Sequence, residues 1–265
     1  MKIGFFDSGL GGLFLLKKVI KVLPQYDYLF LADLRQSPYG NRSPQVIYDF
    51  TREAAEYLFK NDCQIIILAC NTASALALRK LQQEYLSTSY PGRRLLGVVV
   101  PTIEEVLKYK IKRLGILATK ATIESGVYIK EIRKLNSKIR VFQYSAPLLV
   151  SLIENNSLRW AEPILRAYLK PLVSKKVEAI ILGCTHYAVL KKRVQKIVGP
   201  KIKVISQEEI IPQKLADYLA RHPEIAGKLS KTGKIIFETT DLGADFCQIA
   251  KKWFGKNIDL KLVAY

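Results

Sequence analysis

The sequence predicts an α/β protein of two similar lobes, each a largely parallel sheet flanked by helices, with the functional site in the cleft between them. Short apolar runs alternate with longer amphipathic stretches along the chain, which is typical of parallel sheets covered by helices. Two of these runs, 64–69 and 177–183, are each followed by a cysteine. The two cysteines are 114 positions apart (184 minus 70), and the runs at 2–6 and 113–118 have a comparable spacing, which suggests a diverged internal duplication.

The composition favours a protein without a membrane partner. The 265 residues are 49% hydrophobic, enough for a substantial core in one large domain or two modest ones. No apolar run approaches the roughly 20 residues that span a bilayer, and no signal peptide opens the sequence. We therefore expect a cytoplasmic protein. The four cysteines form no Cys-x-x-Cys pair and are expected to be free thiols.

The formal net charge of +19 is the most unusual global property. Such a charge is compatible with a nucleic acid, an anionic membrane or an acidic protein as partner, and it would draw small anions toward a cleft. The lysines, however, are spread over helices and turns without one dense basic run. This pattern favours a solvated, lysine-rich surface, so a nucleic acid is not expected as the main partner.

The first part of the chain is expected to form four strands and three helices. Short runs rich in β-branched and aromatic residues predict strands at 2–6, 28–32, 64–69 and 95–100. Amphipathic stretches predict helices at 13–22, 43–60 and 73–85. Pro44 suits the first turn of the second helix, and Asn71 and Thr72 are expected to cap the third.

Two loops in this part carry distinctive residues. Asp7-Ser8-Gly9-Leu10-Gly11-Gly12 follows the first strand, and its glycines allow successive backbone N–H groups to turn toward an anion. It matches neither a dinucleotide fingerprint nor a Walker loop, and Asp7 and Ser8 also suit plain turn and cap positions. In the loop at 33–42, Pro38 and Gly40 shape the chain around Tyr39 and can present its phenol.

The rest of the chain continues the alternation. Apolar runs predict strands at 113–118, 139–144, 177–183 and 201–205, with helices at 102–109, 123–135, 148–154, 160–173 and 187–198. The tail is expected to add a helix at 211–220, a strand at 234–239, a helix at 244–254 and a strand at 258–263.

Two composition changes divide the chain into the expected lobes. The segment 86–94 is rich in Ser, Thr, Pro and Gly, and a second boundary falls near Ser206. We expect residues 1–95 and 207–265 to form the first lobe, because the tail is needed to complete its sheet, and residues 96–206 to form the second.

Cys70 and Cys184 occupy equivalent strand–helix junctions, where ligands bind in open parallel sheets. The positive end of the following helix favours a thiolate at such a position. If the lobes face one another, one cysteine can remove a proton from a carbon while the other delivers a proton to the opposite face. This chemistry inverts a stereocentre, and it requires no redox cofactor.

The neighbouring polar residues have expected supporting roles. Backbone amides at the helix starts, with Ser8, Asn71, Thr72 and Thr185, can hold carboxylates, and Thr119 at a similar junction is a further substrate-binding candidate. Asp7 and His186 are candidates to tune the cysteines or relay protons. A single strand-end cysteine is more often a packed residue, which is the role expected of Cys63 and Cys247. No metal or cofactor is expected, because the cysteines and two histidines form no ligand pattern.

The motifs together resemble one family. Asp7-Ser8-Gly9-x-Gly11-Gly12, Asp33-x4-Pro38-Tyr39-Gly40, Ala69-Cys70-Asn71-Thr72-Ala73-Ser74 and Leu182-Gly183-Cys184-Thr185-His186-Tyr187 stand in the order and spacing of the glutamate racemases, in the aspartate/glutamate racemase family. The resemblance implies cofactor-independent interconversion of L- and D-glutamate for peptidoglycan, and hence a role in cell-wall biogenesis and cell shape. It also leaves a homodimer open.

The same resemblance implies roles for individual residues. Cys70 and Cys184 would be the opposed acid/base pair, assisted by Asp7 and His186. The substrate-contacting pairs would be Asp7-Ser8, Tyr39-Gly40, Asn71-Thr72 and Thr185-His186, and Glu154 falls where the family often has a glutamate near the cleft. The chain departs from the family pattern at Ala146, Ala188, Val100-Pro101-Thr102 and Ser206-Gln207. None of these departures removes a proposed catalytic group.

Two alternatives remain open at this point. An aspartate racemase or a diamino-acid epimerase would use the same geometry with a different side-chain pocket. A nucleic-acid-associated regulatory protein is the alternative from another class, suggested by the +19 charge. Salt-sensitive binding that does not depend on the cysteines would distinguish it.

Overall fold

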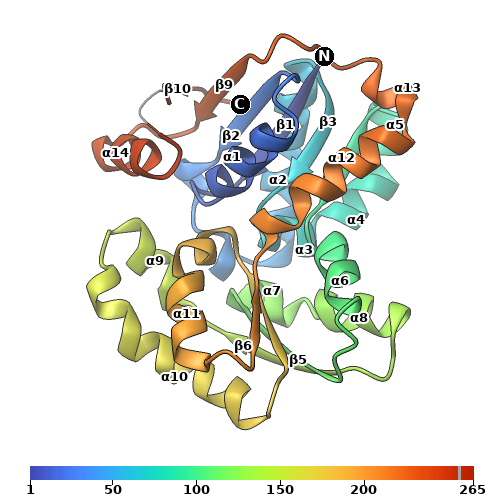
Figure 1. Ribbon diagram of the computed structural model, residues 1–265. Helices are drawn as coiled ribbons and strands as arrows, with labels where there is room; N and C mark the ends of the chain where they lie inside the picture. Colours follow the sequence, from blue (N-terminus) through green and yellow to red (C-terminus); the bar gives the residue numbers. More distant parts are fainter. Residues whose placement is uncertain (256–257) are drawn as a thin grey trace.

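The computed structural model describes residues 1–255 and 258–265 and confirms the α/β fold with two parallel sheets (Figure 1). In this described part, the first sheet has six strands in the order β10-β9-β2-β1-β3-β4. They are β1 (Lys2–Asp7), β2 (Tyr28–Ala32), β3 (Cys63–Leu68), β4 (Arg94–Gly97), β9 (Ile235–Thr239) and β10 (Leu260–Leu262). We call the elements around this sheet the first lobe.

The second sheet, counted over the same residues, has four strands in the order β6-β5-β7-β8. They are β5 (Arg113–Ala118), β6 (Arg140–Ser145), β7 (Ala179–Gly183) and β8 (Lys203–Ile205). We call the elements around it the second lobe. All strand pairs in both sheets are parallel. The carboxyl ends of the central strands, β1 and β3 in one sheet and β5 and β7 in the other, therefore meet at one edge of each sheet.

Burial explains why the central strands read as continuous apolar runs. Every residue of β3 and of β7 is buried, as parallel strands covered by helices on both faces require. The helix α2 (Pro44–Lys60) shows how the covering helices are built. Ser43 Oγ accepts a hydrogen bond from the backbone N–H of Val46, Pro44 occupies the first turn, and a buried face includes Ile47 and Leu58.

The other helices of the first lobe are α1 (Gly12–Val22), α3 (Asn71–Leu76), α4 (Leu78–Lys80), α5 (Ser87–Ser89), α12 (Ile211–Arg221), α13 (Pro223–Ala226) and α14 (Ala244–Trp253). In the second lobe they are α6 (Val99–Leu107), α7 (Lys120–Glu124), α8 (Val127–Leu135), α9 (Leu148–Glu154), α10 (Ala161–Ser174) and α11 (Lys191–Val198). Shorter helical turns occur at Leu34–Gln36, Tyr39–Asn41, Leu81–Leu86, Leu158–Trp160, Thr185–Leu190 and Gln207–Glu209. None of the described helices is long and apolar enough to span a bilayer.

Several expected boundaries are wrong. Asn71 and Thr72 do not cap α3, because Cys70 is the N-cap residue and the helix already begins at Asn71. Helical turns continue into the segment 86–94, the expected lobe boundary, as far as Ser89. The strand expected at 95–100 ends at Gly97, since β4 pairs with β3 only as far as Gly97 opposite Leu68.

Three further elements differ in the second lobe and the tail. The helix expected at 123–135 is divided at Gly126, which has a left-handed φ of 64°. The helix expected at 187–198 starts with a 3-10 turn, Thr185–Leu190, and becomes α-helical only at Lys191. The terminal strand is shorter than the expected 258–263, because only Leu260–Leu262 pairs with β9.

The tail returns to the first sheet. β9 pairs with β2, so that Phe30 lies opposite Phe237, and β10 pairs with β9 at the edge of the sheet. In Figure 1 the orange helix α12 lies beside the blue helix α1. The boundary expected at residue 95 falls within β4, a strand of the first sheet.

Gly97 allows a close approach at the end of β4. A Cβ atom there would lie 2.2 Å from Ser74 Oγ and 2.6 Å from Leu78 Cδ2, and Ser74 Oγ accepts a hydrogen bond from the N–H of Val98. We expect Gly97→Ala to lower the free energy of unfolding by about 1–3 kcal/mol, because the added methyl group displaces these side chains. Urea unfolding measures the loss.

The matched control is Gly92→Ala, because no atom lies within 4 Å of the position that its Cβ would take. This variant should change the free energy of unfolding by less than about 0.5 kcal/mol. Equal losses in the two variants would contradict the steric explanation for Gly97.

Candidate active site

A small cavity of about 40 Å³ lies where the carboxyl edges of the two sheets face each other. Both expected cysteines contribute to its wall, Cys70 from the end of β3 and Cys184 from the end of β7. Of the predicted site residues, the lining includes Ser8, Tyr39, Gly40, Cys70, Asn71, Thr72, Thr119, Cys184, Thr185 and His186. Asp7 and Glu154 do not line the cavity but contact residues that do. The sequence did not single out other lining residues, namely Ser37, Asn41, Pro147, Val150 and Ser151.

Cys70 lies between Ser8 and the start of α3. Its side chain is nearly buried, and its Sγ is 3.2 Å from Ser8 Oγ. Burial raises the pKa of the Cys70 thiol to about 12, and the nearby carboxyl of Asp7 adds to the increase. Hydrogen bonds from Ser8 and from the backbone N–H of Ala73 act in the opposite direction. Cys70 is therefore a thiol in this closed cleft, with two donors placed to stabilise a thiolate.

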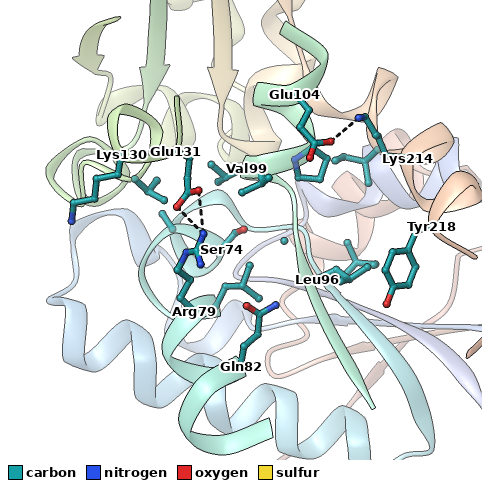
Figure 2. Close-up of a pocket in the computed structure, with 18 of the residues that line it drawn as sticks. Ser74, Arg79, Gln82, Leu96, Val99, Glu104, Lys130, Glu131, Lys214 and Tyr218 are labelled. Carbon is teal, nitrogen blue, oxygen red and sulfur yellow. Dashed lines mark hydrogen bonds and ion pairs between the residues drawn. The ribbon is translucent and has the colours of Figure 1, made fainter. Parts of the chain in front are cut away.

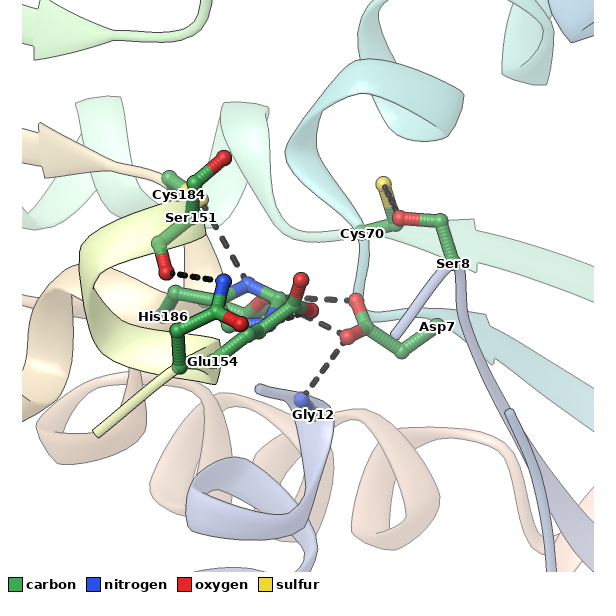
Figure 3. A network of polar contacts seen from close by, with 10 residues as sticks. Asp7, Ser8, Gly12, Cys70, Ser151, Glu154, Cys184 and His186 are labelled. Atoms are coloured by element: carbon green, nitrogen blue, oxygen red, sulfur yellow. Dashed lines mark hydrogen bonds and ion pairs between the residues drawn. The ribbon is translucent and has the colours of Figure 1, made fainter. Parts of the chain in front are cut away.

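Asp7 is fully buried where the two lobes meet (Figure 3). Its Oδ2 accepts a hydrogen bond of 3.0 Å from the N–H of Gly12, and the Thr185 hydroxyl lies 3.3 Å from both carboxylate oxygens. Burial raises the pKa of Asp7 to about 6, although the charge of His186 and the bond from Gly12 oppose that shift. The glycine turn expected to face an anion thus binds the carboxylate of this protein's own Asp7.

The glycines of the same turn allow the second lobe to approach. A Cβ atom at Gly11 would lie 2.5 Å from Thr185 Oγ1 and 2.7 Å from the backbone nitrogen of His186. At Gly9 a Cβ atom would lie 3.0 Å from Glu154 Oε1. The first lobe can contact the loop after Cys184 only because these positions have no side chain.

His186 links Cys184 to Glu154 on α9. Its Nδ1 lies 3.8 Å from Cys184 Sγ, and its Nε2 lies 2.9 Å from Glu154 Oε1. The latter two atoms are at ion-pair distance when His186 is protonated, but they do not form an aligned hydrogen bond. Burial opposes a charge on His186, but Cys184 and Glu154 together raise its pKa well above the ordinary range. The raised pKa favours the imidazolium form of His186 next to the Cys184 sulfur.

Asn71, expected to contact a substrate, is hydrogen-bonded to Tyr128 of the second lobe and to Gln207, which directly follows that lobe in sequence. Its Nδ2 donates to Gln207 Oε1 at 2.6 Å, and its Oδ1 accepts from Gln207 Nε2 and from the hydroxyl of Tyr128. Gln207 stands out in the sequence only as a departure from the family pattern, and no local signal indicated Tyr128. Thr72 makes a similar contact, since its hydroxyl is 2.9 Å from that of Thr119.

Tyr39 and Gly40 line another side of the cavity. The Tyr39 hydroxyl donates a hydrogen bond of 2.6 Å to Asp33, whose other oxygen accepts from Thr240. The phenol oxygen is therefore bonded within the first lobe, while Tyr39 itself lines the cavity. A Cβ atom at Gly40 would lie 2.9 Å from Thr119 Cβ, which explains the glycine. No local signal in the sequence indicates this role for Asp33.

A larger cavity of about 480 Å³ lies elsewhere between the lobes (Figure 2). Across it Arg79 forms an ion pair of 3.0 Å with Glu131, and Lys214 pairs with Glu104. None of the predicted site residues lines this cavity. Cys70 and Cys184 line the smaller cavity instead.

The remaining cysteines lie outside the cleft. Cys63 is fully buried in β3 and Cys247 is half-buried on α14, which fits packing roles. Within the described ranges, no group of three or more His, Cys, Asp or Glu side chains could hold a metal ion.

Comparisons with known proteins agree with this geometry. The sequence model of the Asp/Glu/Hydantoin racemase family matches residues 15–211. A glutamate racemase from Ruegeria pomeroyi is 38% identical over 240 residues, which cover 86% of this chain and 88% of that protein.

Solved structures give the same result over nearly the whole chain. Glutamate racemase isoform RacE1 from Bacillus anthracis superposes with a TM-score of 0.90 at 29% identity, covering 99% of this chain and 97% of that one. Glutamate racemase from Francisella tularensis, solved in complex with D-glutamate, has a TM-score of 0.88 at 29% identity and the same coverage.

The burial of Asp7 predicts a pH dependence of stability. Its pKa rises from 3.8 to about 6 on folding. The stabilisation that the protonated Asp7 contributes to the free energy of unfolding is therefore fully present below pH 3.8 and is lost as the pH rises through about 6. Between about pH 4 and pH 7.5, the free energy of unfolding of the parent protein should fall by about 2 kcal/mol more than that of Asp7→Asn. Unfolding free energies of both proteins at the two pH values test this. Parallel pH profiles would contradict it.

Proposed function

Because this chain belongs to the Asp/Glu/Hydantoin racemase family, we propose that it is a cofactor-independent racemase that interconverts L-glutamate and D-glutamate. The observation that carries the proposal is the pair Cys70 and Cys184, which line one cavity from the ends of two facing sheets. The two cysteines act as opposed acid and base. The thiolate of one removes the Cα proton, and the thiol of the other delivers a proton to the opposite face.

The surroundings of the cysteines support this division. The imidazolium of His186 stabilises negative charge on Cys184, and Glu154 holds the imidazolium. Cys70 starts as a thiol because burial raises its pKa. After proton delivery, the Ser8 hydroxyl and the N-terminus of α3 stabilise the Cys70 thiolate. After one turnover Cys70 is the thiolate and Cys184 is the thiol. This is the protonation state that the reaction in the other direction requires.

Abstraction of a proton next to a carboxylate needs strong stabilisation of the developing charge. Fixed donors aimed at that charge supply such stabilisation in a site without bulk water. Backbone amides at the start of α3 and the hydroxyls of Ser8, Thr72 and Thr185 are the donors available at the cavity. We propose that they hold the substrate carboxylates, with Asn71, Thr119 and the Tyr39-Gly40 backbone completing the pocket.

The cavity must open before an amino acid enters. Its volume of about 40 Å³ is close to the space that one water molecule occupies in the liquid. We propose that residues 1–95 with 207–265 and residues 96–206 separate as two lobes and close again over the substrate. Closure would restore the polar contacts that surround the cysteines.

Glutamate is the proposed substrate because the similar proteins described above are named glutamate racemases and one was solved with D-glutamate. A role in supplying D-glutamate for peptidoglycan, in the cytoplasm, follows from that assignment. The proposed assembly is a homodimer. Aspartate and diamino acids are the alternative substrates for the same two cysteines.

Solvent deuterium incorporation at Cα, followed by NMR in heavy water, tests the proposal. The purified protein with L-glutamate and no added cofactor should exchange the α-proton and form D-glutamate. Cys70→Ala and Cys184→Ala should each lower racemisation by at least about 1,000-fold, because each removes one of the two proton-transfer groups. Cys247→Ala is the matched control and should retain the parent rate.

Each outcome of that experiment has a defined meaning. Substantial racemisation by either cleft variant would contradict the two-base assignment. Exchange with aspartate or a diamino acid but not glutamate would keep the mechanism and change the substrate. The absence of α-proton exchange with all of these amino acids would contradict the racemase proposal.

Glu154→Gln tests the link to His186. The substitution removes the negative partner of the imidazolium, so the pKa of His186 should fall. We expect the alkaline limb of the kcat profile to move to lower pH, with little change in KM. The control is Glu162→Gln. Glu162 is exposed on the next helix, α10, and pairs with Arg166 of the same helix. Identical pH profiles for the parent and Glu154→Gln would contradict the role given to Glu154.

A further inference from the structure

The positive charge of this protein is concentrated in one part of the chain. Residues 96–206 contain 21 Lys and Arg but only 7 Asp and Glu, and so carry +14 of the total formal charge of +19. The rest of the chain, which is longer, carries only +5. Such an asymmetry between two halves of a chain is typical of proteins that bind nucleic acids or membranes.

The fold gathers much of this charge on one face of the second lobe. A segment with basic residues precedes each strand of the second sheet. Because the strands are parallel, all four segments lie at the same edge of the sheet. We call this edge the basic face. Its cations are Lys108, Lys110, Lys112, Arg113, Lys138, Arg140, Lys175, Lys176, Lys201 and Lys203. Within the same four segments, all of them described, Glu178 is the only carboxylate residue.

Most of this charge faces solvent without a compensating partner. All ten cations are exposed except Arg113, which is half-buried. Lys108 pairs with Glu105 at 2.7 Å, and the Glu178 carboxylate accepts a hydrogen bond from the backbone N–H of Lys112. Among the described residues, Lys110, Lys112, Lys138 and Arg140 form no ion pair within 4.0 Å. The basic face thus retains a strongly positive potential.

The shape of the basic face suits an elongated polyanion. Four neighbouring strands about 4.8 Å apart span about 14 Å. Beside them lies an open hollow of about 610 Å³, whose lining includes Lys110, Lys112, Lys138 and Arg140. A nucleic acid duplex carries one phosphate charge per about 1.7 Å of its axis, so 14 Å of duplex presents roughly eight phosphates. That number is comparable to the ten cations.

We propose that the basic face binds the phosphodiester backbone of a nucleic acid, without reading its sequence. The concave lining favours a rounded strand or duplex over the flat surface of a bilayer. The face is also built from the ends of elements, and it presents no amphipathic helix that could lie in a membrane interface. Contacts made by flexible lysines to phosphates provide affinity but no base recognition.

This binding site is compatible with the proposed racemase and goes beyond it. Cys184 follows the carboxyl end of β7, whereas the basic face lies at the amino ends of the strands. The five residues of β7 separate the two by about 17 Å at the usual rise of a strand. The nucleic acid can therefore bind while the cleft remains accessible.

Fluorescence anisotropy with a labelled DNA duplex of about 20 base pairs tests the proposal, with unlabelled RNA of the same length as competitor. The parent protein should bind, and its affinity should fall by at least about 1,000-fold between about 50 and 200 mM salt, as expected for six or more phosphate contacts. A variant with Lys110→Glu, Lys112→Glu, Lys138→Glu and Arg140→Glu should bind at least about 100-fold more weakly at low salt. The slope of log affinity against log salt should fall by about four.

The matched control changes the net charge equally but elsewhere. Lys18→Glu, Lys21→Glu, Lys228→Glu and Lys251→Glu alter four exposed lysines outside residues 96–206, and should lower affinity by less than about 10-fold. Thermal unfolding shows whether both variants remain folded. Equal loss in the two variants would overturn the proposal, because binding would then reflect net charge alone. No binding of the parent at low salt, or binding to phosphatidylserine vesicles but not to nucleic acid, would overturn it as well.

Discussion

The buried carboxylate of Asp7 is the interaction on which the site depends. A carboxylate without water is stable only when donors replace its hydration. One donor is the N–H of Gly12 in the first lobe, and another is the hydroxyl of Thr185 in the second. The approach of the second lobe requires Gly9 and Gly11, since a side chain at either position would meet Glu154, Thr185 or His186. The same contacts bring His186 next to Cys184.

The polar groups at the cleft already have partners in this closed form. Asn71 is paired with Gln207 and Tyr128, and Thr72 is paired with Thr119. The bonds from Asn71 to Tyr128 and from Thr72 to Thr119 cross between the lobes, so the lobe separation proposed above would break them and free their donors and acceptors for a ligand. Ligand binding would then exchange one set of hydrogen bonds for another, and the net change in free energy would be small for each exchanged bond. The residues expected to contact substrate can thus also hold the closed state.

Local patterns in the sequence predicted most elements correctly. The runs that became β3 and β7 are apolar throughout because both faces of each strand are covered, and the cysteines after them are placed by that local pattern. The errors occur where a distant partner decides the structure. β4 ends at Gly97 because β3 offers no further pairing, and the Asn71 side chain binds Gln207, which is 136 residues away in sequence.

The sequence by itself determined the alternation of strands and helices, the two strand-end cysteines and the family motifs, because each depends on residues close together in the chain. Only the tertiary structure decided that Asp7 is buried against Thr185, that the Tyr39 phenol is bonded to Asp33, and that Tyr128 reaches Asn71. The same holds for the basic face. Its lysines and arginines are scattered over about a hundred positions of the sequence, and they form one surface because parallel strands β5 to β8 all begin at the same edge of the sheet.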